Sequence, residues 1–186
     1  MSGSTSRRFW EQKFDHLEDY LRELKNKEKK MDAKNTGATE PAERVLVIER
    51  IFDAPRSLVF KAWTEPERLM RWWGPNGVTT VSCKMDLRAG GTWHITMRSP
   101  RGREERQQGV FREIVGPERL VFTYAFEDPT GKRGHETLVT VTFAEHGGKT
   151  KLTLKQAVFD TVGTRDDHVR GWSEALGHLT EYLATA

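Results

Sequence analysis

The last stretch of the chain, residues 167–184, has the hydrophobic pattern of an amphipathic helix. Its apolar residues recur at spacings of three and four, which places them on one helix face: Val169, Trp172, Leu176, Leu179 and Leu183. At ~1.5 Å per residue, such a helix is about 27 Å long. A single long helix that follows a run of strands is expected to cover the apolar face of their sheet.

The middle of the chain shows a different pattern, in which apolar and polar residues alternate. Gly, Pro and Asn separate the alternating segments, and such short turns join antiparallel neighbours. The pattern predicts a first strand at 44–52 and six further strands at 78–86, 91–99, 104–115, 119–127, 135–145 and 149–159. One face of these strands is apolar, as expected for a sheet with one side in water.

Two short helices, at 56–64 and 65–73, are predicted between the first and second strands. Pro66 stands in the first turn of the second helix, where its missing N–H group costs nothing, and 72–75 end that helix. The element order is therefore β-α-α-β-β-β-β-β-β-α. This order predicts an α+β fold, in which a bent antiparallel sheet of about seven strands wraps round the final helix.

A second amphipathic segment, at residues 6–30, precedes this domain. Its apolar residues follow a 4-3-4-3 spacing with charged residues between them: Trp10, Phe14, Leu17, Leu21 and Leu24. Residues 31–43 are polar and lack periodicity, so the predicted parts are an N-terminal helix at 1–30, a linker at 31–43 and a domain at 44–186. Two interpretations of the helix remain open. It either docks on the domain or on a second copy in a homodimer, or it is an addition before a native start at Met31.

Composition narrows the class of protein. The chain has 186 residues and a formal charge of +3, too small an excess to indicate a nucleic-acid partner. The single cysteine, Cys83, excludes an intramolecular disulfide and a cysteine-rich zinc site. Since no apolar run reaches the length of a membrane span and the N-terminus lacks a signal-peptide core, we expect a soluble, cytoplasmic protein.

The residue types that usually carry catalysis form no recognisable set. The histidines of the domain show no HxH or HExxH spacing, and we expect them to be surface residues: His94, His135, His146, His168 and His178. Cys83 is expected to be an inert strand residue, although Lys84 beside it favours the thiolate slightly. The sequence therefore predicts no metal, no cofactor and no catalytic residue.

The apolar faces of the sheet and helices supply the candidates for a ligand-binding cavity: Trp72, Trp73, Trp93, Ile95, Met97, Phe111, Phe122, Tyr124, Trp172 and Leu176. Aromatic residues also suit plain core packing. Adjacent residues on a helix point about 100° apart, so Trp72 and Trp73 are not both expected in one core. Three polar residues share the inward register, Arg50, Glu113 and Gln156. They either pair with each other or reach water at strand ends, or they orient a ligand.

Four segments carry motifs in a characteristic order: FDAPRSLVFKAWTEPERLMRWWGP (52–75), GGTWHITMRSPRG (90–102), GVFREIVGPERLVFTYAF (109–126) and GWSEALGHLTEYL (171–183). Together they resemble the family of proteins homologous to the activator of heat-shock protein 90 ATPase, over about 44–184. That family belongs to the START-like or Bet v1-like helix-grip superfamily. The resemblance implies a helix-grip fold with an interior ligand cavity. It implies little about activity, because relatives include co-chaperone domains, carriers of hydrophobic ligands and polyketide cyclases.

Three function classes follow from these observations. The preferred one is binding of a small hydrophobic or aromatic molecule between sheet and final helix, without catalysis, in a cavity on the order of a few hundred Å³. The second is stimulation of a heat-shock chaperone ATPase, although one N-terminal helix cannot replace the additional domain of the chaperone activator. The third is a polyketide cyclase or dehydratase. Gln156 argues against it, because glutamine is no general base where related sequences often carry histidine.

Overall fold

The computed structural model describes residues 42–186, so the predicted N-terminal helix and most of the predicted linker lie outside the described residues. Residues 40–186 form a compact unit of their own. Its strands are β1 (Leu46–Phe52), β2 (Thr79–Met85), β3 (Thr92–Arg98), β4 (Glu104–Val115), β5 (Arg119–Phe126), β6 (Thr137–His146) and β7 (Lys149–Ala157). Its helices are η2 (Ala42–Arg44), a single 3₁₀ turn, and α2 (Arg56–Thr64), α3 (Pro66–Leu69) and α4 (Val162–Leu183).

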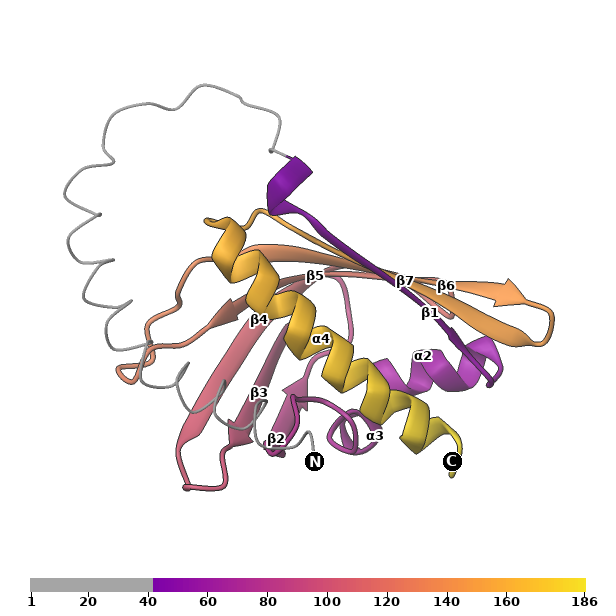
Figure 1. The fold of residues 1–186 in the computed structure, drawn as a ribbon, viewed down its shortest axis with the longest axis horizontal. Coiled ribbons are helices and arrows are strands. Elements are labelled where there is room, and N and C mark those ends of the chain that lie inside the picture. Colours follow the sequence, from indigo (N-terminus) through magenta and orange to yellow (C-terminus); the bar gives the residue numbers. More distant parts are fainter. Residues whose placement is uncertain (1–41) are drawn as a thin grey trace. The chain divides into compact units, whose positions relative to one another are not determined.

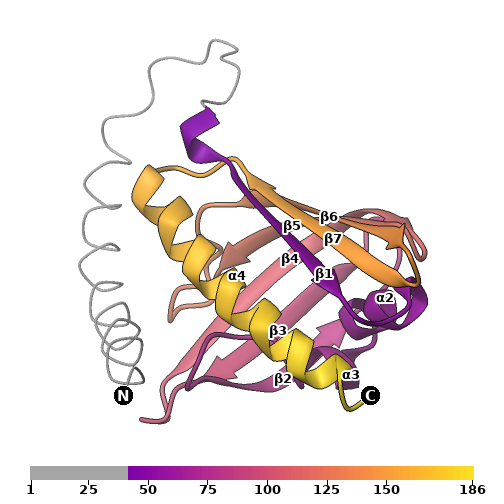
Figure 2. The ribbon, with the colours of Figure 1, turned by 45° about the vertical axis from the view of Figure 1, so that its right-hand side comes forward.

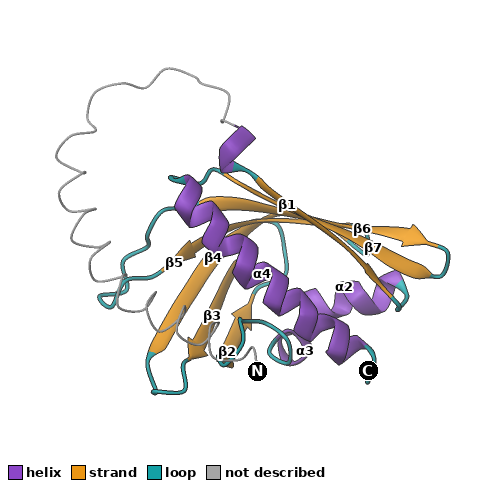
Figure 3. Ribbon diagram, in the orientation of Figure 1, coloured by secondary structure: helices purple, strands orange, loops and turns teal. Residues whose placement is uncertain are grey.

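The predicted α+β fold is confirmed. Seven antiparallel strands form one sheet in the order β1-β7-β6-β5-β4-β3-β2, so β1 and β2 are its two edges. The strands β2 to β7 follow one another as neighbours, and β1 pairs with β7, with Leu46 opposite Gln156 and Phe52 opposite Thr150. Helix α4 runs across the inner side of the bent sheet (Figures 1 and 2). Helices α2, α3 and α4 all lie on this side (Figure 3), so the core is the layer between them and the sheet.

Helix α4 begins at Val162, five residues before the predicted start. The Thr161 hydroxyl accepts a hydrogen bond from the Thr164 N–H at 3.0 Å, as an N-cap residue does. The prediction missed this start because the apolar stripe begins only in the second turn. The predicted apolar stripe is confirmed in the middle of the helix, where Trp172, Leu176 and Leu179 are buried. The length and apolar content of a membrane-spanning helix are not found in any helix of residues 42–186.

The end of α3 corrects the prediction for the two adjacent tryptophans. The helix was expected to reach residue 73, but it ends at Leu69 and turns follow. The 100° rule therefore does not apply to Trp72 and Trp73, and both are buried, at 1% and 7% exposure. Trp72 turns toward α2 and Trp73 toward β4, where their indole N–H groups find separate acceptors. Both tryptophans therefore belong to the core.

A β-bulge in β4 corrects the prediction for Glu113. Phe111 lies opposite Phe122 and Glu113 lies opposite Val121, so β4 contains one extra residue at this point. The extra residue reverses the alternation, and Glu113 leaves the inner face that Phe111 occupies. Its side chain is 44% exposed and lies 3.7 Å from the Arg119 guanidinium. Glu113 is therefore a surface residue in a weak ion pair.

Candidate functional site

A small cavity of about 20 Å³ lies in the space between the sheet and the helices. Nine apolar side chains line it: Trp63, Leu69, Trp73, Met85, Trp93, Ile95, Phe111, Leu120 and Phe122. That volume is roughly the room one water molecule needs. This cavity is therefore much smaller than the expected few hundred Å³, because aromatic rings from α2, from the segment after α3 and from three strands surround it closely.

The cavity brings together five of the predicted ligand-binding residues: Trp73, Trp93, Ile95, Phe111 and Phe122. Six others are buried elsewhere in the core: Trp72, Met97, Tyr124, Gln156, Trp172 and Leu176. Glu113 lies outside, for the reason given above. Sequence reasoning did not name Trp63, Leu69, Met85 or Leu120 as lining residues. The alternation that includes Phe122 also includes Leu120, and this signal was sufficient to find that residue.

Trp63, on α2, stands at the centre of an aromatic cluster. Its ring centroid lies 5.8 Å from that of Trp172 in a stacked arrangement and 4.8 Å from that of Trp72 in a tilted one. Trp73 and Phe143 meet it edge-on at 6.0 and 6.2 Å. These separations are typical of favourable aromatic pairs. The cluster joins α2, α4 and the segment after α3, so it holds the helices together above the sheet.

The indole N–H groups of this cluster are not equally satisfied. Five tryptophans of residues 42–186 are buried, and four of them donate to an oxygen atom. The pairs are Trp72 to Ala62 O (3.0 Å), Trp73 to Gln107 Oε1 (2.9 Å), Trp93 to Thr123 O (3.1 Å) and Trp172 to Gln156 Oε1 (2.7 Å). Nε1 of Trp63 is buried and has no hydrogen-bond partner within residues 42–186. A buried donor without an acceptor costs about 1–3 kcal/mol. A trapped water needs two to four polar partners, and the apolar lining offers few.

Gln156 faces inward, as predicted, and its amide is used inside the protein. The amide oxygen accepts from Trp172, and the amide N–H donates to the Thr137 hydroxyl at 2.8 Å. The Thr137 hydroxyl in turn donates to the Tyr124 carbonyl at 3.1 Å. All four residues are buried, so these bonds form a structural network that ties β5, β6, β7 and α4 together. Arg50, the third polar candidate, is exposed on the edge strand β1.

Two titratable groups near the core have raised pKa values. Burial raises the pKa of the Cys83 thiol to about 11, so the thiol stays protonated at neutral pH, as an inert strand cysteine would. Burial is also the main reason why the pKa of Tyr124 lies well above its ordinary value, and the Glu105 carboxylate adds to it. Neither group belongs to an acid–base pair at the cavity. Within residues 42–186, no group of three or more His, Cys, Asp or Glu side chains is placed to hold a metal ion.

The surface prediction for His168 is wrong, because this residue is 8% exposed. Since α4 begins at Val162, His168 falls on the inner stripe, four residues before Trp172. Its Nδ1 lies 2.9 Å from the Thr164 carbonyl oxygen, and the ring contacts three aromatic residues, Tyr124, Phe126 and Phe159. His168 therefore contributes to the packing between α4 and the sheet, away from the cavity.

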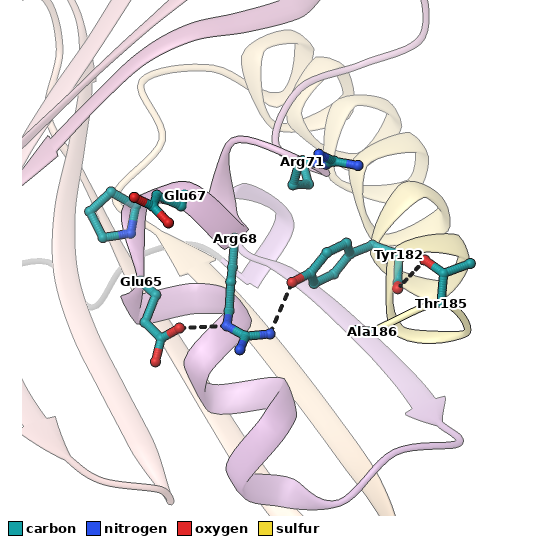
Figure 4. Close-up of a pocket in the computed structure, with 8 residues that line it drawn as sticks. Glu65, Glu67, Arg68, Arg71, Tyr182, Thr185 and Ala186 are labelled. Carbon is teal, nitrogen blue, oxygen red and sulfur yellow. Dashed lines mark hydrogen bonds and ion pairs between the residues drawn. The ribbon is translucent and has the colours of Figure 1, made fainter.

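A larger hollow of about 780 Å³ lies on the surface, between α3 and the end of α4. Glu65, Glu67, Arg68, Arg71 and Tyr182 line it, together with Pro66, Thr185 and Ala186 (Figure 4). Arg68 donates through Nε to the Glu65 carboxylate and through Nη1 to the Tyr182 hydroxyl at 3.1 Å. Two acidic and two basic side chains leave this groove without a net charge preference. Arg68 acts here as a brace between α3 and α4.

A bent seven-stranded sheet closed round a long C-terminal helix, with an aromatic-lined space between them, defines a helix-grip domain. The model of the family described as Activator of Hsp90 ATPase homolog 1-like protein matches residues 53–184, and the chain belongs to that family. The predicted family resemblance is thus confirmed. A search of curated proteins found no match.

Solved structures support the same fold. A crystal structure of a Nitrosomonas europaea protein is 27% identical, with a TM-score of 0.67, and the match covers 78% of this chain and 97% of that one. The AHSA1 protein from Silicibacter pomeroyi is 26% identical, with a TM-score of 0.69, over 76% of this chain and 98% of that one. A solution structure from Arthrobacter aurescens is 24% identical, with a TM-score of 0.69, over 81% and 94%. The similarity to the Arthrobacter aurescens protein supports the fold alone.

Proposed function

We propose that this domain binds a small, largely apolar molecule that carries one hydrogen-bond acceptor, in the space between the sheet and α4. The observation that carries the proposal is the Trp63 indole N–H, which is buried without a partner within residues 42–186, on a side chain that lines the apolar cavity. An acceptor on the ligand removes the penalty of this donor. An aromatic ring matches the edge-on and stacked rings around it.

Binding requires the cavity to expand, because about 20 Å³ holds no organic molecule. Met85, the last residue of the edge strand β2, is one of the non-aromatic lining residues, and methionine adapts its shape readily. Burial of ligand surface contributes about 25 cal/mol per Å², and the expansion and the loss of ligand freedom oppose it. Micromolar dissociation constants are the expected range for such a balance.

The proposal does not include catalysis. General acid–base chemistry needs a side chain that exchanges a proton within reach of the ligand. None of the nine lining side chains titrates in the physiological range, and the amide of Gln156 is occupied by Trp172 and Thr137. The chaperone-ATPase and cyclase alternatives stay predictions, since no contact among the described residues supports either.

A matched pair of probes tests the proposed hydrogen bond. Acetophenone and α-methylstyrene have nearly the same shape, but only acetophenone has a carbonyl acceptor. We expect the ratio of their affinities, measured by calorimetry, to fall about fivefold in Trp63→Phe, which corresponds to roughly 1 kcal/mol. Trp72→Phe is the matched control, because the Trp72 N–H donates to Ala62 and Trp72 does not line the cavity.

Two outcomes contradict the proposal. If neither probe binds the wild-type protein saturably, the cavity is no ligand site. If both probes bind and their affinity ratio is the same in wild type and Trp63→Phe, the Trp63 N–H does not meet the ligand. Product analysis on the same samples identifies any turnover, which would assign an enzymatic function instead.

A further inference from the structure

Two side chains of α4 hold the turn formed by residues 74–77, which follows α3 and is here named the 74–77 turn. The Glu174 carboxylate accepts the Asn76 backbone N–H at 2.9 Å. The His178 ring meets the turn twice, with Nδ1 3.1 Å from the Gly74 carbonyl oxygen and Nε2 2.8 Å from Oδ1 of Asn76. Glu174 and His178 are four residues apart, so they lie on the same side of the helix.

The two contacts of His178 have different proton requirements. A carbonyl oxygen only accepts, so Nδ1 carries the proton that reaches Gly74. The Asn76 amide offers its oxygen to a protonated Nε2 and, after a half-turn, its N–H to a neutral Nε2. Both ring nitrogens of His178 therefore have a partner in the 74–77 turn.

The other end of the same segment is fixed to the sheet through Trp73, a lining residue of the cavity. Its backbone oxygen accepts from the Thr80 hydroxyl on β2 at 2.7 Å, and its indole N–H donates to Gln107 on β4. Gly74 has a φ of +113°, and a Cβ added there would lie 3.2 Å from Sδ of Met97 on β3. The segment thus joins the sheet to α4 at the cavity, and Figures 1 and 2 show the chain between α3 and β2 beside α4.

We propose that the 74–77 turn controls access to the cavity and that Glu174 and His178 hold it closed; this inference rests on the proposed function. When the contacts with α4 break, the turn stays attached to the sheet through Trp73, and the gap between α4 and the β2–β3 edge widens. Apart from the bond between Arg68 and Tyr182, most of the other packing of the helices uses buried apolar side chains. The turn contacts are polar and partly exposed, so they open at a lower free energy than the buried apolar packing does.

The test compares Glu174→Ala/His178→Phe with wild type. Hydrogen exchange of the peptide that contains residues 74–78, measured by mass spectrometry, is expected to become about tenfold faster, because the Asn76 amide loses its charged acceptor. Acrylamide quenching of the buried tryptophans reports access to the cavity without any ligand, and we expect it to increase. Stopped-flow fluorescence with acetophenone is expected to show about tenfold faster association and dissociation.

Two variants serve as controls. Glu174→Gln keeps an oxygen that accepts the Asn76 N–H, so its exchange and quenching should stay within about twofold of wild type. His146→Phe changes an exposed histidine at the end of β6 and should alter none of the three measurements. Circular dichroism and a cooperative unfolding transition establish that each variant is folded.

The outcomes separate this inference from the proposed function. Faster exchange of the turn without increased acrylamide quenching overturns the inference, because the turn then opens without exposing the cavity. Unchanged exchange in the double variant also overturns it. Increased exchange and quenching support the inference even if acetophenone does not bind wild type, a result that would contradict the proposed function alone.

Discussion

The inner face of the sheet has two regions that differ in how their polar groups are satisfied. Around Gln156, the Trp172 indole, the Gln156 amide and the Thr137 hydroxyl form a continuous set of bonds of 2.7 to 2.8 Å, with no cavity lining among these residues. Around Trp63, an indole of the same type is buried at the cavity without a partner within residues 42–186. The rings of Trp63 and Trp172 stack, so the two regions share a border.

Within one aromatic core, the hydrogen bonding of buried polar atoms distinguishes structural positions from candidate functional ones. Trp63 and Trp172 are the same residue type, so a hydrophobicity scale does not distinguish them. They differ in the hydrogen bonding of the indole N–H, which has an acceptor at Trp172 and none within residues 42–186 at Trp63. A buried donor without an acceptor carries a free-energy penalty that a ligand can remove. The comparison therefore predicts that deleting the indole N–H costs more stability at Trp172 than at Trp63.

The largest effect is expected for Trp172→Ala. The change removes a buried indole from the middle of α4 and leaves the Gln156 oxygen without its donor, so unfolding should become easier by about 3–5 kcal/mol. Denaturant unfolding measures this directly. Val47→Ala, at a position that is 60% exposed, is the control and should change stability by less than about 0.5 kcal/mol. A loss below about 1 kcal/mol for Trp172→Ala would contradict its place in the core.

A smaller effect is expected for Trp172→Phe, which keeps a ring but removes the N–H group. The buried Gln156 oxygen then lacks its donor, and the protein should lose about 2 kcal/mol, a typical value for such a group. The double variant Trp172→Phe/Gln156→Leu should recover part of this loss, because it removes both partners. If the double variant loses more unfolding free energy than Trp172→Phe and Gln156→Leu lose together, the hydrogen bond between Trp172 and Gln156 does not stabilise the protein as described.

The matching change on the cavity side, Trp63→Phe, should alter the free energy of unfolding by less than about 1 kcal/mol. The loss of an unpaired donor offsets the loss of ring area. The same denaturant experiment measures the difference between the two Trp→Phe variants, which is the sharpest form of the comparison. Equal losses in both would mean that the Trp63 N–H is satisfied in solution and that the two regions do not differ.

The effect that is smallest at neutral pH concerns Cys83, whose contribution to stability changes only in alkaline solution. Cys83 lies opposite Ile95, a lining residue, and its pKa is raised to about 11 from 9.0. The unfolded state therefore releases this proton first as pH rises, so stability should fall gradually between about pH 9 and pH 11. Cys83→Ser should remove this share of the decline, and the raised pKa of Tyr124 leaves a further decline above pH 10. Alkylation of Cys83 by iodoacetamide should be very slow at neutral pH and accelerate toward pH 11.

The features of this protein that depend on local periodicity could be predicted from its amino-acid sequence. Strand alternation predicted the seven strands to within a few residues, and Gln156 was predicted inward because it follows Leu154 by two positions. The spacing of Trp172, Leu176 and Leu179 predicted the buried face of α4. Such patterns need no knowledge of distant neighbours, because they follow from the geometry of a strand or a helix.

Features that depend on contacts between distant elements could not be predicted from the sequence and follow from the tertiary structure. The extra residue in β4 places Glu113 on the outer face, and the alternation of apolar and polar residues did not indicate this β-bulge. The end of α3 at Leu69 allowed Trp72 and Trp73 to be buried together. The volume of the cavity and the missing partner of Trp63 depend on distances between α2, α4 and the sheet. Periodicity assigns a residue to one face of a strand or helix. The volume left next to that face depends on the side chains of other elements that pack against it.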